Sequence, residues 1–420
     1  MNLRNIHHRY KGTAKNISLY FSASLLKAVI SLLMNPFVAL NMTHTDYAIT
    51  GYFGSFSSLL FPVLSLSFFQ YYSKNYFKFS EDKRKRMRTT ISSALLLIGL
   101  LELVLIFICF YAYFQIYNVS FPFFPYAVLS FSSIFFNNFF QFKLVDLKLK
   151  RDAKAFFKYN LYNTIVYSGL VLVLVILLKL GALGSLTSSL LAGIIAGLYC
   201  FFKLVKKIEI DKAILKDALL FCWPLIIAAS MNYFFSGIDR AMLEQINDNY
   251  NLGLYNVAFG ITGYLAIFYT AIAQTFQPDI FQAVAANNKK KLIKIVGGLN
   301  LLNAIPIIAF IALAPIVIKI LTFDRYTEAS QFARILALKN ITSCVYFSIS
   351  SIIIAYGYSK VTLINKIIGT IICIVMFKVL ISKYGFFGAA WGQVLSFFFM
   401  SAISSVFLIY KFKPRKSAQL

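Results

Sequence analysis

Five charged side chains lie inside stretches of sequence that are otherwise apolar: Lys27, Glu102, Asp239, Arg240 and Lys339. A charge at the centre of a bilayer costs about 2.5–3.5 kcal/mol on insertion scales, so such residues are expected to face the protein interior or a wet cavity. A lysine or arginine there could bind an anionic group, and a lone carboxylate could bind a proton or a sodium ion. These residues are the first candidates for a binding site.

Both lysines stand in polar stripes along single helical faces. Lys27, Ser31 and Asn35 are spaced four residues apart, which places them on one face of a helix. Lys339 shares its face with three further polar side chains, Ser343, Tyr346 and Ser350. Either lysine could instead extend to a membrane interface. That alternative is strained for Lys27, which lies well inside its apolar stretch, so a binding role is favoured there, while both interpretations stay open for Lys339.

Asp239 and Arg240 are adjacent and precede a polar turn at 247–251. The pair could bind a ligand, or it could form a structural ion pair at a helix end. Gln274, in the next apolar stretch, could hydrogen-bond to a polar ligand. Glu102 could couple transport to an ion gradient, or it could sit protonated against a neighbouring helix, since no second acidic residue can be assigned beside it.

The composition indicates a membrane protein. Hydrophobic residues make up 59% of the 420 residues and charged residues only 13%, whereas soluble domains average about 45–50% apolar residues. The formal net charge of +26 would suggest a nucleic-acid partner in a soluble protein. Here the basic residues gather in short segments between apolar runs, where they determine membrane orientation, so no nucleic-acid partner is expected.

The apolar runs predict an all-α protein with twelve transmembrane helices. The predicted spans are 17–40, 49–73, 89–114, 122–145, 159–179, 183–205, 218–243, 252–279, 292–321, 331–356, 361–381 and 386–410. Most of the lysines and arginines lie in the two terminal segments and in the loops after even-numbered spans. By the positive-inside rule, both termini and those loops are predicted to be cytoplasmic.

The chain repeats itself at an offset of about 204 residues. The segment 179–184, KLGALG, matches 383–388, KYGFFG, and Gln70 and Asn35 fall on Gln274 and Asp239. Two six-helix bundles of the same orientation are therefore expected, related by a pseudo-two-fold axis along the membrane normal. The predicted boundaries are 1–205 for the N-terminal bundle, 206–217 for a cytoplasmic amphipathic linker, and 218–420 for the C-terminal bundle.

Several chemistries find no support in the sequence. The five cysteines show no paired spacing, and neither a phosphate-binding loop nor an HExxH motif is present. No loop is long enough to hold a soluble catalytic domain. We therefore expect a protein that is not an enzyme, that has no metal site or cofactor, and that works as a monomer, with possible coupling to an H⁺ or Na⁺ gradient. The high aromatic content of 17% is expected mainly on lipid-facing and interfacial surfaces.

Four motifs carry a resemblance to a known family: the Asp239-Arg240 pair, Gly253-Leu-Tyr255 followed by Ala258, KYGFFGAA at 383–390, and GALG at 181–184. The chain resembles the O-antigen and capsule repeat-unit flippases of the multidrug/oligosaccharidyl-lipid/polysaccharide exporter (MOP) superfamily. The resemblance covers the whole chain in length, span count and repeat. The first half departs most, because Asp46-Tyr47-Ala48 lacks the glycine found at Gly253.

The resemblance implies a bacterial inner-membrane flippase that moves an undecaprenyl-diphosphate-linked oligosaccharide to the outer leaflet by alternating access. Its partners would be that lipid-linked glycan, membrane lipids, and a polysaccharide polymerase with its chain-length regulator. The diphosphate needs cationic groups and the sugar needs hydrogen-bonding groups. The predicted substrate-binding residues are Lys27, Ser31, Asn35, Asp239, Arg240, Gln274 and Lys339, with Glu102 as the predicted ion-coupling residue.

Three other functions remain open at this stage. An exporter of small amphipathic molecules would have the same architecture, although cationic compounds would favour a carboxylate-lined cavity. A membrane-embedded polymerase predicts a long outer loop, and the predicted outer loops are short. A scaffold within a polysaccharide assembly complex would not require charges inside the membrane.

Overall fold

The computed structural model describes residues 22, 25–205 and 207–412. The side chains of residues 268, 271, 274, 275, 278, 285, 359, 411 and 412 lie outside that description. All regular structure in the described part is helical, which confirms the predicted all-α fold class. Helices suit a bilayer because their backbone hydrogen bonds are satisfied within one segment.

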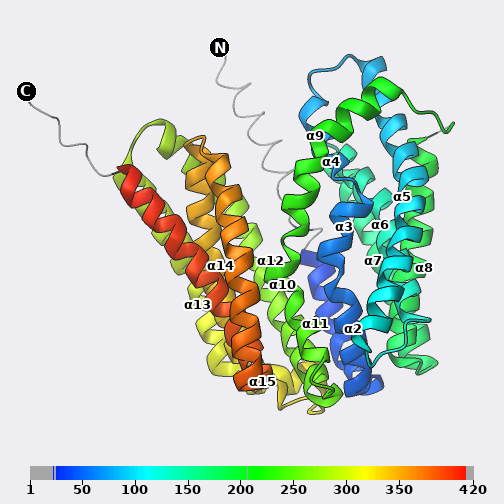
Figure 1. The fold of residues 1–420 in the computed structure, drawn as a ribbon, viewed down its shortest axis with the longest axis vertical. Coiled ribbons are helices and arrows are strands. Elements are labelled where there is room, and N and C mark those ends of the chain that lie inside the picture. Colours follow the sequence, from blue (N-terminus) through cyan, green and yellow to red (C-terminus); the bar gives the residue numbers. More distant parts are fainter. Residues whose placement is uncertain (1–21, 23–24, 206, 413–420) are drawn as a thin grey trace, which may run out of the picture. The chain divides into compact units, whose positions relative to one another are not determined.

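The first half of the chain begins with a helix at Leu25–Asn41 and continues through α2 to α8 (Figure 1). These helices are α2 His44–Ser55, α3 Ser57–Leu64, α4 Phe68–Asn75, α5 Glu81–Tyr117, α6 Tyr126–Leu149, α7 Ala153–Val171, the π-helix η1 Leu172–Leu177 and α8 Gly181–Leu204.

The second half contains α9 to α15 (Figure 1). Its helices are α9 Lys212–Ser230, α10 Tyr233–Ser236, α11 Ile238–Glu244, α12 Asn249–Ala285, α13 Lys289–Thr322, α14 Ala329–Ala355 and α15 Ser359–Phe412. The last of these is interrupted at Gly385, whose φ of 54° is left-handed.

Eight helical segments in the described part are long and apolar enough to cross a bilayer. They are His44–Leu64, Glu81–Tyr117, Ala153–Leu177, Gly181–Leu204, Lys212–Ser236, Lys289–Thr322, Ala329–Ala355 and Lys360–Tyr410. The 51-residue segment Lys360–Tyr410 contains two of the predicted spans. These segments make the chain a multi-pass membrane protein. Because neither α6 nor α12 is among the eight, the count of twelve spans stays a prediction.

The described helices form two compact units. The first comprises Met1–Tyr233, Asn247–Gly253 and Ile320–Arg325, and the second comprises Phe234–Ile246, Leu254–Lys319 and Tyr326–Leu420. Two short segments of the second half therefore belong to the first unit. There, Asn35 Nδ2 donates to Leu321 O at 2.8 Å and the His44 ring stacks on Tyr250 at 4.1 Å between centroids.

The predicted linker 206–217 is built from two parts. Residues 207–211 are not helical, and the backbone N–H groups of Glu209 and Asp211 donate to Ser93 Oγ at 3.2 Å and Thr90 Oγ1 at 3.1 Å on α5. Helix α9 starts at Lys212 and packs on α3, α4 and α5 within the first unit. The compact first unit thus extends beyond the linker, through α9 to Tyr233.

The core of the first unit is built where α6 packs on α8. Gly193 and Gly197 form a GxxxG pair on α8, and a Cβ atom at Gly197 would collide with the backbone of Phe136 on α6. Small residues at this spacing allow two membrane helices to approach closely, and van der Waals packing then replaces the hydrophobic effect as the source of stability.

Aromatic side chains fill much of the first unit. Phe131, Phe135, Phe139 and Phe142 lie on α6 and are each at most 1% exposed. The expectation that aromatic residues mainly face lipid is therefore wrong for this unit. The reason is chemical: lipid tails are as apolar as a Phe side chain, so burial is governed by packing and not by hydrophobicity.

The repeat at an offset of 204 residues has a matching backbone conformation. Gly181 and Gly385 both have a φ of 54°, a left-handed value that glycine adopts at little cost. Gly184 and Gly388, three residues later, each lie against a backbone carbonyl of the preceding helical segment, where a Cβ atom would collide. These glycines therefore serve backbone geometry in both halves.

Candidate functional site

The second unit brings together three of the predicted site residues. Asp239 and Arg240 lie on α11, a seven-residue helix that follows breaks in the apolar stretch at Met231–Asn232 and at Gly237. Lys339 lies on α14. All three contact residues of α12 or α15. We call the group formed by these three residues with Tyr255, Phe259 and Gln393 the charged cluster.

Asp239 is fully buried and is held through one oxygen. Its Oδ2 atom accepts hydrogen bonds from Tyr255 OH on α12 at 2.6 Å and from Gln393 Nε2 on α15 at 2.9 Å. The Oδ1 atom is buried without a hydrogen-bond partner in the described part of the chain. The carboxylate is therefore fixed in place but retains free acceptor capacity.

Arg240 is 5% exposed and only partly satisfied. Its Nη1 atom donates to Ser236 O at 3.1 Å, and its guanidinium carbon lies 3.6 Å from the centroid of the Phe259 ring. The Nη2 atom is buried and has no hydrogen-bond partner among the described residues. An unsatisfied buried donor costs about 1–3 kcal/mol, and more when it is charged.

Lys339 shares the same aromatic ring. Its Nζ atom lies 4.5 Å from the Phe259 centroid and 6.0 Å from that of Phe397. The polar residues on its helical face, Ser343, Tyr346 and Ser350, are buried at 9%, 2% and 8% exposure. The lysine therefore points along a face that packs inside the unit, which disfavours extension to a membrane interface.

The charges of the cluster are close but not paired. Among the described residues, no ion pair within 4.0 Å joins Asp239 to Arg240 or Lys339. The two cations thus share the Phe259 ring, and the carboxylate of Asp239 is held by the neighbouring helices α12 and α15. The buried Glu244 on α11 has a partner of its own. Such a group can accept an anion through charge-assisted hydrogen bonds from the guanidinium and the ammonium.

The first unit holds the other predicted cation and its stripe. Lys27 is exposed on the helix Leu25–Asn41, and Ser31 is half-buried. Asn35 donates its amide N–H to Leu321 O, a contact that ties the C-terminal end of α13 to this helix. The structure therefore gives Asn35 a structural contact, and the binding roles of Lys27 and Ser31 stay predictions.

Two further predicted residues are Gln274 and Glu102. Gln274 belongs to α12, but its side chain lies outside the described residues. Glu102 lies on α5, half-buried, with its Oε2 atom buried and without a hydrogen-bond partner in the described chain. No group of three or more His, Cys, Asp or Glu residues that could hold a metal occurs among the described residues. The ion-coupling role of Glu102 stays a prediction.

Tyr255, Phe259 and Gln393 were not among the predicted site residues. A signal for Tyr255 was present: Asp239 and Tyr255 are equally distant from Asn247 in the polar turn, so an antiparallel hairpin places them side by side. Phe259 follows one turn after Tyr255 on α12. Gln393 lies 154 residues from Asp239 along the chain, and no local pattern connects the two.

The first unit contains a second buried carboxylate with a different environment. Asp146 on α6 accepts from Tyr72 OH at 2.7 Å and from Lys150 Nζ at 2.7 Å, and Arg88 Nη1 lies 4.0 Å away. We call this group the paired cluster. Both carboxylate oxygens are used, and Lys150 and Arg88 reach the surface with side-chain exposures of 38% and 26%.

A family model described as "Polysaccharide biosynthesis protein" matches residues 13–284. An uncharacterized membrane protein of Methanocaldococcus jannaschii is 26% identical over 252 residues, covering 54% of this chain and 58% of that protein. A probable low-salt glycan biosynthesis flippase of Haloferax volcanii is 23% identical over 176 residues, covering 41% of this chain and 37% of that protein. The matches thus span less than two thirds of either relative.

Solved structures share the fold over nearly the whole chain. An inward-facing multidrug resistance MATE transporter of the MOP superfamily has a TM-score of 0.72 at 14% identity, covering 94% of this chain and 98% of that one. The lipid II flippase MurJ in an inward closed conformation has a TM-score of 0.67 at 16% identity, covering 93% and 87%. The fold is therefore that of the MOP superfamily transporters.

Proposed function

Because the chain belongs to the polysaccharide biosynthesis protein family, we propose that it is a flippase for lipid-linked oligosaccharide repeat units. Its substrate would be a glycan of the O-antigen or capsule type carried on undecaprenyl diphosphate. The protein would move this headgroup from the cytoplasmic to the outer leaflet by alternating access while the isoprenoid tail stays in lipid.

The observation that carries this proposal is the unsatisfied cation at the centre of the charged cluster. Arg240 has a buried nitrogen without a partner, and Lys339 lies beside it at the same ring. Burying such a donor is costly unless a ligand completes it. A diphosphate is dianionic or more, and its oxygens can accept from both groups at once.

The neighbouring carboxylate makes this binding reversible. Asp239 is held by Tyr255 and Gln393 and carries a free oxygen close to the two cations. A bound anion and this carboxylate compete for the same positive charge, which weakens the binding. A transporter needs such a balance, because a substrate held too tightly would not leave on the other side.

Orientation and energy supply complete the proposal. The basic loops support an orientation with both termini in the cytoplasm, and the proposed location is the inner membrane of a bacterial cell. Glu102, with an unpartnered oxygen in the membrane-spanning helix α5, is proposed to bind the H⁺ or Na⁺ that drives export. A polysaccharide polymerase and its chain-length regulator would receive the exported unit.

Export of small amphipathic cations is a second candidate, favoured by one observation. The free Oδ1 atom of Asp239 is a buried acceptor of the kind that a cationic compound would need, and the fold is shared with a multidrug MATE transporter. Efflux of a cationic dye from cells producing the protein tests this alternative. Efflux that is lost in Asp239→Asn and kept in Arg240→Ala would support it.

The sidedness of the lipid-linked oligosaccharide tests the flippase proposal directly. Spheroplasts with and without the protein are treated with a membrane-impermeant lectin, which detects only glycan on the outer face. We expect accumulation of lectin-inaccessible glycan in the deletion strain and reversal by the wild-type gene. A double variant, Arg240→Ala with Lys339→Ala, provides the matched control. Equal lectin access in all strains would overturn the proposal.

A further inference from the structure

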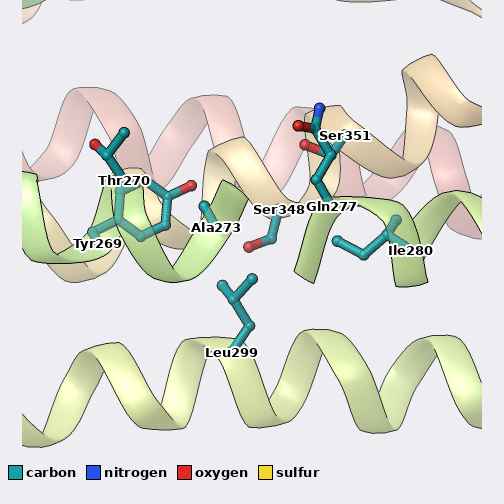
Figure 2. A pocket seen from close by; sticks show the side chains of 8 residues that line it. All are labelled: Tyr269, Thr270, Ala273, Gln277, Ile280, Leu299, Ser348 and Ser351. Carbon is teal, nitrogen blue, oxygen red and sulfur yellow. The ribbon is translucent and has the colours of Figure 1, made fainter. Parts of the chain in front are cut away.

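A small pocket with apolar walls and several polar side chains lies within the second unit (Figure 2), and none of its lining residues belongs to the charged cluster. Its volume is about 140 Å³. The lining residues come from three helices: Tyr269, Thr270, Ala273, Gln277 and Ile280 on α12, Leu299 on α13, and Ser348 and Ser351 on α14. None of these side chains carries a charge at neutral pH.

Free hydrogen-bonding groups stand at both ends of the pocket. In Figure 2 the Tyr269 ring directs its hydroxyl toward Ala273, and the Gln277 amide lies beside Ser351 at the other end. Neither the Tyr269 hydroxyl nor the Gln277 amide forms a hydrogen bond with another described residue. Each group can both donate and accept.

The serines and the threonine supply acceptors. Ser348 and Ser351 donate to the carbonyls of Cys344 and Phe347, each at 2.8 Å, and Thr270 donates to Ala266 O at 2.8 Å. Their hydroxyl protons are therefore used within their own helices, while their lone pairs remain open to a ligand.

The walls of the pocket combine a stacked aromatic ring with apolar side chains. The Tyr269 ring stacks on Phe347 with centroids 6.3 Å apart, so the phenol is held in one orientation. Leu299 alone faces the pocket from α13, and Ala273 leaves room at the centre (Figure 2). A ligand would thus meet apolar carbon on two sides and hydroxyl or amide groups along its edge.

These features define the chemical class of the ligand. The pocket is larger than the roughly 30 Å³ that one water occupies, but smaller than the roughly 300–1,000 Å³ of sites that enclose a whole drug-sized ligand. It therefore suits one part of a larger substrate. An anionic part would want a cation in the lining, whereas a neutral ring bearing several hydroxyls matches the donors and acceptors present.

We propose that this pocket is a subsite for a neutral sugar ring of the transported glycan. This inference rests on the proposed flippase function and extends it. Tyr269 follows Phe259 by ten residues on α12, which corresponds to about 15 Å at 1.5 Å per residue. The pocket therefore takes a sugar remote from the diphosphate, and the spacing lets one oligosaccharide contact both sites.

Binding of carrier lipids of graded glycan length tests this inference. The purified full-length protein in lipid nanodiscs is titrated with undecaprenyl diphosphate, bare or carrying one to four neutral hexoses. We expect the wild type to gain affinity once the glycan is long enough to reach the pocket. Tyr269→Phe and Gln277→Leu should each lower that gain by about 2- to 10-fold, the effect of one lost hydrogen bond, without changing the affinity for bare carrier.

Controls separate the pocket from the charged cluster. Tyr410→Phe makes the same chemical change at a site that is 80% exposed and should bind every probe as the wild type does. Matching melting temperatures for all variants exclude misfolding. Unchanged length dependence in both pocket variants would overturn the sugar subsite, while loss of bare-carrier binding in Arg240→Ala would leave the flippase proposal standing. If the wild type bound none of the probes, both proposals would fall.

Discussion

Asp146 and Asp239 are both fully buried in the membrane-embedded chain, yet their surroundings differ in kind. Asp146 uses both oxygens, has a lysine at 2.7 Å and a guanidinium nitrogen at 4.0 Å, and its cations reach the surface. Asp239 uses one oxygen and has no cation within 4.0 Å among the described residues, and the Nη2 atom of its neighbour Arg240 is buried without a hydrogen-bond partner there.

The surroundings of Asp146 and Asp239 distinguish a structural charge from a functional charge in this protein. The cost of burying a carboxylate is offset only by good ion-pair geometry with further hydrogen bonds, and Asp146 has both, with a lysine and a tyrosine hydroxyl each at 2.7 Å. In the paired cluster the one buried atom without a partner in the described chain is Arg88 Nε, whereas the charged cluster leaves both an acceptor, Asp239 Oδ1, and a donor, Arg240 Nη2, unused. A ligand that supplies both missing partners would make the burial of the charged cluster more favourable. The paired cluster therefore holds the first unit together, whereas the charged cluster of the second unit is prepared for a partner.

The largest expected effect is on stability at the paired cluster. Asp146→Ala removes the shared acceptor of Tyr72, Lys150 and Arg88, and we expect a loss of about 3 kcal/mol, at the low end for breaking a buried pair because the two cations can still reach water. Asp239→Asn keeps an acceptor for Tyr255 and Gln393 and should unfold almost as the wild type does. Denaturation in detergent micelles measures both. Equal destabilisation would erase the contrast between the two aspartates.

Transport should respond in the opposite way. Arg240→Ala and Lys339→Ala each remove one charge-assisted contact to the substrate, worth about 1.5–3 kcal/mol, so export should fall by about 10- to 100-fold at unchanged protein level. Arg240→Lys keeps the charge but loses the planar fork and should recover only part of the activity. The lectin assay reports the rate, with Lys150→Ala as the control in the paired cluster. Full export in both alanine variants would remove them from the site.

An effect of intermediate size is expected for the stability of variants at the two repeated glycines, Gly181 and Gly385. Gly181→Ala and Gly385→Ala both place a Cβ atom at a φ of 54°, which costs about 1–2 kcal/mol. At Gly181 the new atom would also collide with the Asp46 carboxylate, whereas the space around Gly385 is open. Gly181→Ala should therefore lower the melting temperature more than Gly385→Ala. A larger loss for Gly385→Ala would contradict the predicted collision with Asp46.

The smallest effect is expected at the support of Asp239. Tyr255→Phe removes one hydrogen bond to the carboxylate and should cost about 1 kcal/mol in stability. Because the carboxylate then turns more freely, the apparent affinity for undecaprenyl diphosphate should change while that of the Tyr410→Phe control does not. Calorimetry on the purified protein measures the affinity. An unaltered affinity would limit Tyr255 to a packing role.

The sequence allowed the fold class to be predicted because apolar runs and basic loops are local signals. The all-α fold and the glycine at the middle of α15 follow from such signals. The break between α3 and α4 was missed, since Leu66 and Ser67 adopt left-handed φ values of 47° and 49° that neither residue type favours. Tertiary packing imposes these angles, and no local pattern indicates them.

The site was predictable only as far as charge makes a residue conspicuous. Asp239, Arg240 and Lys339 stood out because a charge in an apolar stretch is rare. Phe259 is one of 44 phenylalanines, and its place between two cations depends on how α11, α12 and α14 meet. Gln393 could not be predicted either, because its partner Asp239 lies on a helix that is distant in the chain.

At the offset of 204 residues, the charged cluster has no counterpart. Asp239, Arg240 and Lys339 correspond to Asn35, Pro36 and Phe135. The two halves therefore share backbone geometry at Gly181 and Gly385 but not chemistry.

Two segments of the second half belong to the first compact unit, and this limits where the chain can be divided. Residues 247–253 and 320–325 come from the second half but are part of the first compact unit, where Leu321 accepts from Asn35 and Arg325 Nη1 donates to Ala39 O at 3.3 Å. A chain split at the linker would separate the first bundle from segments that complete it. The N-terminal fragment alone would then be an incomplete folding unit, and the two fragments should regain activity only by complementation when produced together.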